Sequence, residues 1–110
     1  MPIFGLFGRK KAPSKGHSEE DNRKAQEAGC VNGRHYTTYV EEVKQLKREG
    51  KLAEAEKLLL RLIKAVEAQA QIDKLSLAPW YYEQLGIVYR KMGEKAKADA
   101  IAARYKNWKR

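Results

Sequence analysis

Two segments of this chain match each other at a single offset. Gly50-Lys-Leu-Ala-Glu-Ala55 aligns with Gly93-Glu-Lys-Ala-Lys-Ala98, 43 residues further on, and the same offset pairs Tyr39 with Tyr82. Internal repeats of this size are typical of helical hairpins, which bury their apolar faces against one another because one hairpin cannot bury its own. The repeat therefore predicts an all-α fold of two antiparallel helix hairpins, with about four helices.

Hydrophobic periodicity places the ends of these helices. Apolar residues recur at helical spacing, and Gly50 and Gly93 follow the first and third periodic segments, as expected of C-terminal glycines. Thr38 with Glu41 predicts a capping box at the start of the first helix. The helices are expected over Tyr39–Glu49, Leu52–Asp73, Pro79–Met92 and Lys95–Asn107.

The helical wheel also predicts which side chains face the core. In the last helix the expected core stripe consists of Ala98, Ile101, Ala102, Tyr105 and Trp108. Leu60 lies out of step among the charged residues of the second helix. We therefore expect Leu60 to be a lone surface leucine, or to be covered by a docked N-terminal segment or a second subunit.

Residues 1–36 have a different composition from the rest of the chain. Glycines, prolines and basic residues crowd residues 1–17, which predicts a flexible basic arm. A short helix is possible over Glu19–Ala28, and Asn32-Gly33 predicts a turn because both residue types tolerate positive φ. Residues 1–36 are therefore expected to form a flexible N-terminal arm that includes this short helix, and the helical domain is expected to occupy residues 37–110.

Charge and cysteine content limit the partners and the compartment. The net charge is +9, which attracts acidic partners of any kind. Cys30 is the only cysteine, which fits a reducing compartment. No segment has the roughly 20 apolar residues of a membrane helix, and the apolar N-terminal residues precede the basic ones, unlike a signal peptide. A cytoplasmic location is expected.

The repeated residues resemble the tetratricopeptide repeat family. Its pattern places an aromatic residue, Leu-Gly and Tyr on the first helix of each hairpin, a glycine in the turn, and small residues on the second helix. In the second copy these positions are Tyr82, Leu85-Gly86, Tyr89, Gly93, Ala98 and Ala102. The first copy departs from the pattern at Val43, and its second helix is longer than the family's. The resemblance covers about residues 37–108.

This resemblance implies a peptide-binding groove lined by the first helix of each hairpin. The matching positions here are Lys44, Lys47, Arg48, Trp80, Glu83, Ile87, Arg90 and Lys91. Arginine side chains in such a groove form charge-assisted hydrogen bonds with carboxylates, and a tryptophan can anchor an apolar residue. The expected function is a protein–protein interaction module that binds an acidic or extended peptide; the alternative is that these residues are ordinary solvated charges.

Other partners remain open. Basic residues concentrate in the last helix and Trp108 could stack on a base, so nucleic acid is the main rival partner. The segment from Ile3 to Lys15 has apolar residues followed by basic ones, as in peripheral membrane anchors, although a membrane partner is not favoured. Because two repeats are fewer than an array usually needs, a homo-oligomer is also possible.

The residues that could support catalysis or bind a metal are few. Cys30 with His17 and His35 matches no usual zinc spacing, and Gly5 and Gly8 lack the preceding strand of a phosphate loop. A loop cysteine beside His35 with no third orienting group is more often inert than nucleophilic. The sequence therefore predicts a non-enzymatic protein with no catalytic residues, no metal site and no cofactor.

Overall fold

The computed structural model describes residues 19–108, which are mostly helical. The predicted arm over residues 1–17 lies outside the described residues. Within them the chain forms five α-helices, a two-stranded antiparallel sheet and a short 3-10 helix. These are α1 (Glu19–Ala28), β1 (Cys30–Val31), β2 (Arg34–His35), η3 (Tyr36–Tyr39), α2 (Val40–Arg48), α3 (Leu52–Asp73), α4 (Pro79–Lys91) and α5 (Lys95–Lys106). The predicted helix over Glu19–Ala28 is confirmed, and the other four helices agree with prediction to within one residue at each end.

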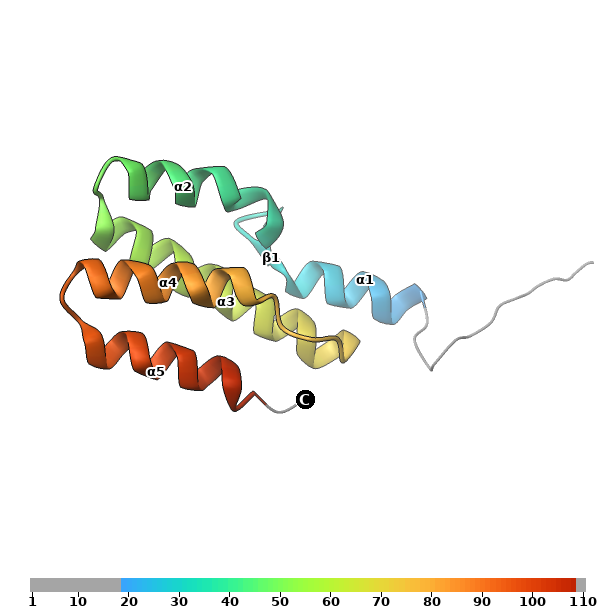
Figure 1. Cartoon of the computed structure of the whole chain (residues 1–110). Helices are drawn as coiled ribbons and strands as arrows, with labels where there is room; N and C mark the ends of the chain where they lie inside the picture. The colour runs from blue at the N-terminus through green and yellow to red at the C-terminus, as the bar shows by residue number, and fades with distance from the viewer. Residues whose placement is uncertain (1–18, 109–110) are drawn as a thin grey trace, which may run out of the picture.

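Helix α3 is the element on which the others assemble. It contacts α1, α2 and α4, and α4 in turn contacts α5. Figure 1 shows α2, α4 and α5 one below another, with α3 passing behind α4 and α1 lying beside the far end of α3. The turns from α2 to α3 and from α4 to α5 lie at the same end of the molecule.

Glycines form both of these turns. Gly50 has φ +73° and Gly93 has φ +78°, the left-handed conformation that glycine adopts without steric cost. Each follows a helix whose last turn is basic: Lys47 and Arg48 at the end of α2, and Arg90 with Lys91 at the end of α4. Pro79 occupies the first turn of α4, where the absence of its N–H costs nothing.

The core lies between α3 and the helices around it. Val43, Leu59, Leu62, Ile63, Leu85 and Val88 are its largest fully buried side chains. The predicted core stripe of α5 is only partly buried. Ala98 and Ile101 are buried, whereas Ala102 and Tyr105 are exposed, which corrects the prediction. Periodicity identified one face of α5, and within the described residues no element covers the outer half of that face.

The packed part of the described chain begins at Glu19, before the predicted start near Tyr36. Ala25 and Val31 are buried, and α1 contacts α3. Asn32 (φ +52°) and Gly33 (φ +83°) form the predicted turn, and β1 and β2 pair across it. The sequence did not predict this hairpin, because strands of two residues show no alternation of apolar and polar side chains.

The predicted capping box at Thr38 and Glu41 is wrong. The Thr38 hydroxyl donates to the His35 carbonyl (2.8 Å) and accepts from Arg34 Nε (3.2 Å). Helix α2 starts after Tyr39 and has no side-chain cap. The 3-10 helix η3 separates the hairpin from α2, and the Thr38 hydroxyl is held by Arg34 and His35 of the hairpin instead of capping the helix.

Gly29 lies where the hairpin approaches α3 too closely for a side chain. A Cβ there would lie 2.3 Å from Gln69 Oε1 and 2.8 Å from His35 Nε2. These two side chains cannot easily move apart, because His35 Nε2 donates to Gln69 Oε1 (2.6 Å) and Gln69 Nε2 donates to Asp73 Oδ2 (3.3 Å). Gly29 therefore lets the hairpin approach α3 closely.

We expect Gly29→Ala to lower the free energy of unfolding by about 1–3 kcal/mol, the usual cost of overpacking. Gly33 is the matched control, because no atom lies within 4 Å of the Cβ it would gain. Asparagine tolerates positive φ, so Gly33→Asn should cost less than about 0.5 kcal/mol. Urea denaturation followed by circular dichroism measures both values, and equal losses would contradict the close approach at Gly29.

Candidate interaction surface

Seven of the eight predicted groove residues are distributed over two neighbouring surfaces. Four basic side chains lie at the ends of α2 and α4; we call this set the basic end, and it comprises Lys44, Lys47, Arg48 and Lys91. Glu83, Ile87 and Arg90 instead line a groove between α4 and α5. Trp80 lies apart from both sets: it is half-buried against the core, and its ring packs edge-on against Tyr81 (centroids 5.0 Å apart).

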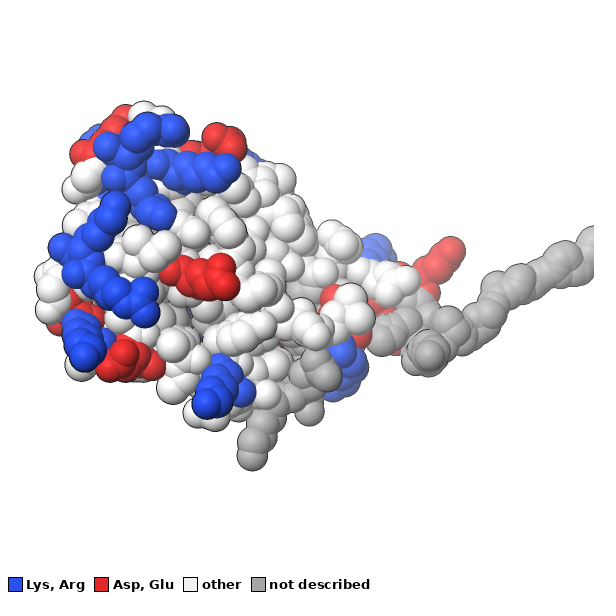
Figure 2. Space-filling view, viewed as in Figure 1, with Lys and Arg blue, Asp and Glu red and all other residues white. Residues whose placement is uncertain are grey.

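The basic end lies where α2 and α4 both finish. Figure 2 shows Lys and Arg side chains gathered over these two helix ends, while the surface over the rest of α4 has an acidic group among mostly uncharged atoms. Lys44 pairs with Glu41 across one exposed helical turn (3.6 Å), and Arg48 donates to Gln45 Oε1 (3.1 Å). Among residues 19–108, Lys47, Arg48 and Lys91 make no ion pair.

Lys47 connects the two helices at this end. It is half-buried, and its ammonium donates to Gln84 Oε1 on α4. Burial lowers the pKa of Lys47, and the nearby positive charge of Lys91 lowers this pKa further. Both effects disfavour the charged form. The fold thus places Lys47 and Lys91 at the ends of neighbouring helices, with the Lys47 ammonium on the neutral side chain of Gln84 and no ion pair for either lysine within the described residues.

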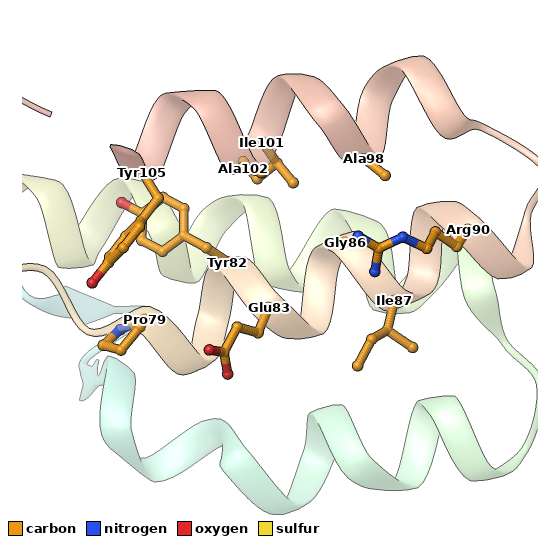
Figure 3. Close-up of a pocket in the computed structure, with 10 residues that line it drawn as sticks. All are labelled: Pro79, Tyr82, Glu83, Gly86, Ile87, Arg90, Ala98, Ile101, Ala102 and Tyr105. Atoms are coloured by element: carbon orange, nitrogen blue, oxygen red, sulfur yellow. The ribbon is translucent and has the colours of Figure 1, made fainter. Parts of the chain in front are cut away.

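The groove between α4 and α5 was not foreseen. It has a volume of about 410 Å³, and we call it the α4–α5 groove. Figure 3 shows its lining side chains, with α4 along one side and α5 along the other. The lining residues are Pro79, Tyr82, Glu83, Gly86, Ile87, Arg90, Ala98, Ile101, Ala102 and Tyr105. Most of them are apolar, and the charged groups among them are Glu83 and Arg90.

A hydrogen-bonded cluster holds α3, α4 and α5 together beside this groove. Arg104 binds Glu67 through two hydrogen bonds of 2.7 Å, and the Tyr82 hydroxyl donates to Glu67 Oε2 (2.9 Å). Burial, followed by the contact with Glu67, raises the pKa of Tyr82. Glu67 also raises the pKa of Arg104. The cluster fixes Tyr82, whose ring packs against that of Tyr105 (centroids 5.2 Å apart), and so keeps one wall of the groove in place.

Two other predictions concern single apolar side chains. Leu60 is half-buried and packs against the core, and it lines a shallow hollow together with Tyr89 and Arg104. It is therefore not a fully exposed surface leucine, and its covering by an N-terminal segment or a second subunit stays a prediction. Trp108 also packs partly against the core, and its Nε1 is buried without a hydrogen-bond partner among the described residues.

The sequence contained one signal for the α4–α5 groove. Gly86 is the one residue of α4 without a side chain, and it lines the groove together with Ala98 and Ala102 of α5. Small residues at matching helical positions allow close helix approach or leave a hollow, and only the packing distinguishes these outcomes. Here they leave a hollow.

Comparisons of the chain with models of known protein families, with curated proteins and with solved structures found no match. Between residues 19 and 108, no helix is both long and apolar enough to cross a membrane. The same part of the chain contains no cluster of three or more His, Cys, Asp or Glu side chains that could hold a metal ion.

Proposed function

We propose that this chain is a non-enzymatic helical module that captures an acidic segment of a partner protein at its basic end. The observation that carries the proposal is the pair of ammonium groups of Lys47 and Lys91. Burial lowers the pKa of Lys47, the positive charge of Lys91 lowers this pKa further, and neither lysine makes an ion pair among residues 19–108. A carboxylate between the two ammonium groups would offset the positive charge and gain charge-assisted hydrogen bonds.

A tandem arrangement of two helix hairpins, similar to tetratricopeptide repeats, is part of the proposal. It is supported by the contacts of α2 with α3 and of α4 with α5. The left-handed glycines Gly50 and Gly93, which are 43 residues apart, also support it. In such an arrangement α2 and α4 are the first helices of their hairpins, and the basic end spans both.

A protein ligand is favoured over nucleic acid by the position of the aromatic residues. Single-stranded nucleic acid is usually held by aromatic rings on which its bases stack. Trp108, the residue predicted for this role, is half-buried against the core with its ring nitrogen buried. The basic end itself comprises lysines and one arginine, which can hold carboxylates without stacking.

The test measures binding of a fluorescently labelled peptide of about ten Asp and Glu residues by fluorescence polarisation. Lys47→Gln combined with Lys91→Gln is expected to weaken binding by about tenfold or more, because hydrogen bonds to charged groups are the strong ones. Lys57→Gln with Lys64→Gln is the matched control: both lysines are exposed on α3 and make no ion pair within the described chain. This control should retain most of the affinity.

Two results would contradict the proposal. One is an equal loss of affinity in both double variants, which would show that only net charge matters. The other is that a single-stranded oligonucleotide of the same charge binds more tightly than the acidic peptide, and that the double variant Lys47→Gln with Lys91→Gln no longer binds it. This result would favour the nucleic-acid function.

A further inference from the structure

The α4–α5 groove exposes apolar surface on its α5 side. Ala102 and Tyr105 line it and are exposed, whereas Ala98 and Ile101 of the same helix face are buried. Its volume of about 410 Å³ falls within the usual range of binding pockets, about 300–1,000 Å³. The groove therefore has room for an apolar side chain of a partner.

Arg90 connects this groove with the basic end. It lines the groove, and it lies in the last turn of α4 directly before Lys91 of the basic end. Figure 3 shows its side chain running back along α4 toward Gly86. A Cβ built on Gly86 would lie 3.9 Å from Arg90 Nη1, so the guanidinium lies against the helix at the groove. The positive surface of the basic end thus continues into the groove.

The guanidinium of Arg90 has no anionic partner within residues 19–108. Arg34 and Arg104 each pair with a carboxylate, whereas Arg90 makes no ion pair in this part of the chain. Glu83, the acidic residue that lines the groove, precedes it by seven residues, about 10.5 Å along the helix axis. A carboxylate supplied by a partner could therefore bind Arg90 through charge-assisted hydrogen bonds.

We propose that the acidic segment captured at the basic end also carries an apolar side chain, and that this side chain enters the α4–α5 groove. The proposal rests on the proposed function, because the same segment binds both surfaces. One carboxylate of the segment binds Arg90. The apolar side chain beside it packs against Ala102 and Tyr105.

The charges along the groove set the order of residues in the partner. Arg90 lies next to the basic end, and Glu83 lies further along α4 toward Pro79. A carboxylate is attracted to Arg90 and repelled by Glu83, since the energy of two charges depends on their signs and separation. The acidic residues of the partner therefore end at Arg90, and the apolar side chain follows them into the groove.

Binding of two labelled peptides to the full chain, measured by fluorescence polarisation, tests the proposal. Both peptides contain the same run of Asp and Glu residues, with a leucine at each end of one and an asparagine at each end of the other. A leucine can then reach the groove in either chain direction. The leucine-ended peptide is expected to bind about tenfold more tightly, because the groove removes its apolar side chain from water.

Substitutions in α5 show whether the leucine lies in the groove. Ala102→Gln should remove the gain, because a polar side chain would then fill the groove, and it should leave the affinity for the asparagine-ended peptide unchanged. Ala103→Gln is the matched control, since Ala103 is exposed on α5 outside the groove. It should keep the gain. Arg90→Gln should weaken both peptides, and circular dichroism checks that every variant is folded.

The outcomes separate this proposal from the proposed function. Equal affinity of the two peptides would overturn the apolar anchor and leave the proposed function standing, whereas binding of neither would overturn both. A leucine gain that Ala102→Gln leaves unchanged would place the leucine elsewhere and contradict the proposal. A gain that appears only with Phe4→Asp and Phe7→Asp would overturn it in favour of the N-terminal segment as the occupant. A gain that disappears as the protein concentration rises would overturn it in favour of a second copy.

Discussion

Replacing Leu85 with alanine is expected to lower the free energy of unfolding by about 2–5 kcal/mol. Leu85 is 0% exposed and belongs to the continuous core cluster. The loss combines the transfer free energy of the deleted atoms with the cost of the cavity left behind, which close-packed surroundings cannot fill. Since small domains are stable by only about 5–15 kcal/mol, this single change removes a large part of the stability.

Urea denaturation followed by far-ultraviolet circular dichroism gives the free energy of unfolding. Leu85→Met is the matched control, because it keeps the volume and apolar character and should cost less than about 1.5 kcal/mol. Equal losses for Leu85→Ala and Leu85→Met would show that the shape of the side chain matters more than the cavity. A negligible loss for Leu85→Ala would contradict the position of Leu85 in the core.

Alkaline pH is expected to destabilise the fold strongly between pH 10 and pH 12. Burial, together with the proximity of Tyr36, raises the pKa of Tyr81 to about 12. Burial and a hydrogen bond to Glu56 raise the pKa of Tyr89 to about 12. Burial and the contact with Glu67 raise the pKa of Tyr82 as well. All three hydroxyls lie on α4 and must stay protonated in the folded protein.

The direction of the effect follows from proton linkage. The unfolded chain releases these protons near pH 10, whereas the folded protein retains them to higher pH. Their stabilising contribution is therefore fully present below pH 10 and is lost as the pH rises through about 12. Each tyrosine that titrates only in the unfolded chain reduces stability by about 1.4 kcal/mol per pH unit.

Urea denaturation between pH 9 and pH 12 measures this slope. Tyr81→Phe removes one titrating group and should make the slope shallower. A slope that Tyr81→Phe does not alter would contradict the role of the buried phenol.

The bounds of the long helices could be predicted because several local signals agree there. Helix α3 has an apolar stripe of six turns and lies between Gly50 and the connector before Pro79. Helix α4 has Pro79 at its start and Gly93 after its end. When periodicity, capping and turn residues indicate the same boundary, the assignment does not depend on tertiary contacts.

The rest depends on contacts between distant parts of the chain. The hydrogen bond of His35 with Gln69 joins residues 34 positions apart, and no local pattern marks either side chain. Similarly, periodicity placed Ala102 and Tyr105 on the apolar face of α5 but could not show that part of this face is uncovered. The groove predicted as a single surface forms two surfaces in the structure for the same reason. Only the position of α5 beside α4 determines that Glu83, Ile87 and Arg90 line a separate groove.

The length of α3 determines which parts of the molecule can unfold separately. Its 22 residues span about 33 Å, and α1, α2 and α4 all contact it. Opening α3 would detach each of these helices at once, so its central amides should exchange with solvent only when the whole molecule unfolds. Helix α5 is held mainly by α4 and by the Glu67–Arg104 pair, so it can open alone. Local opening of α5 would remove one wall of the α4–α5 groove while the remaining helices stay folded.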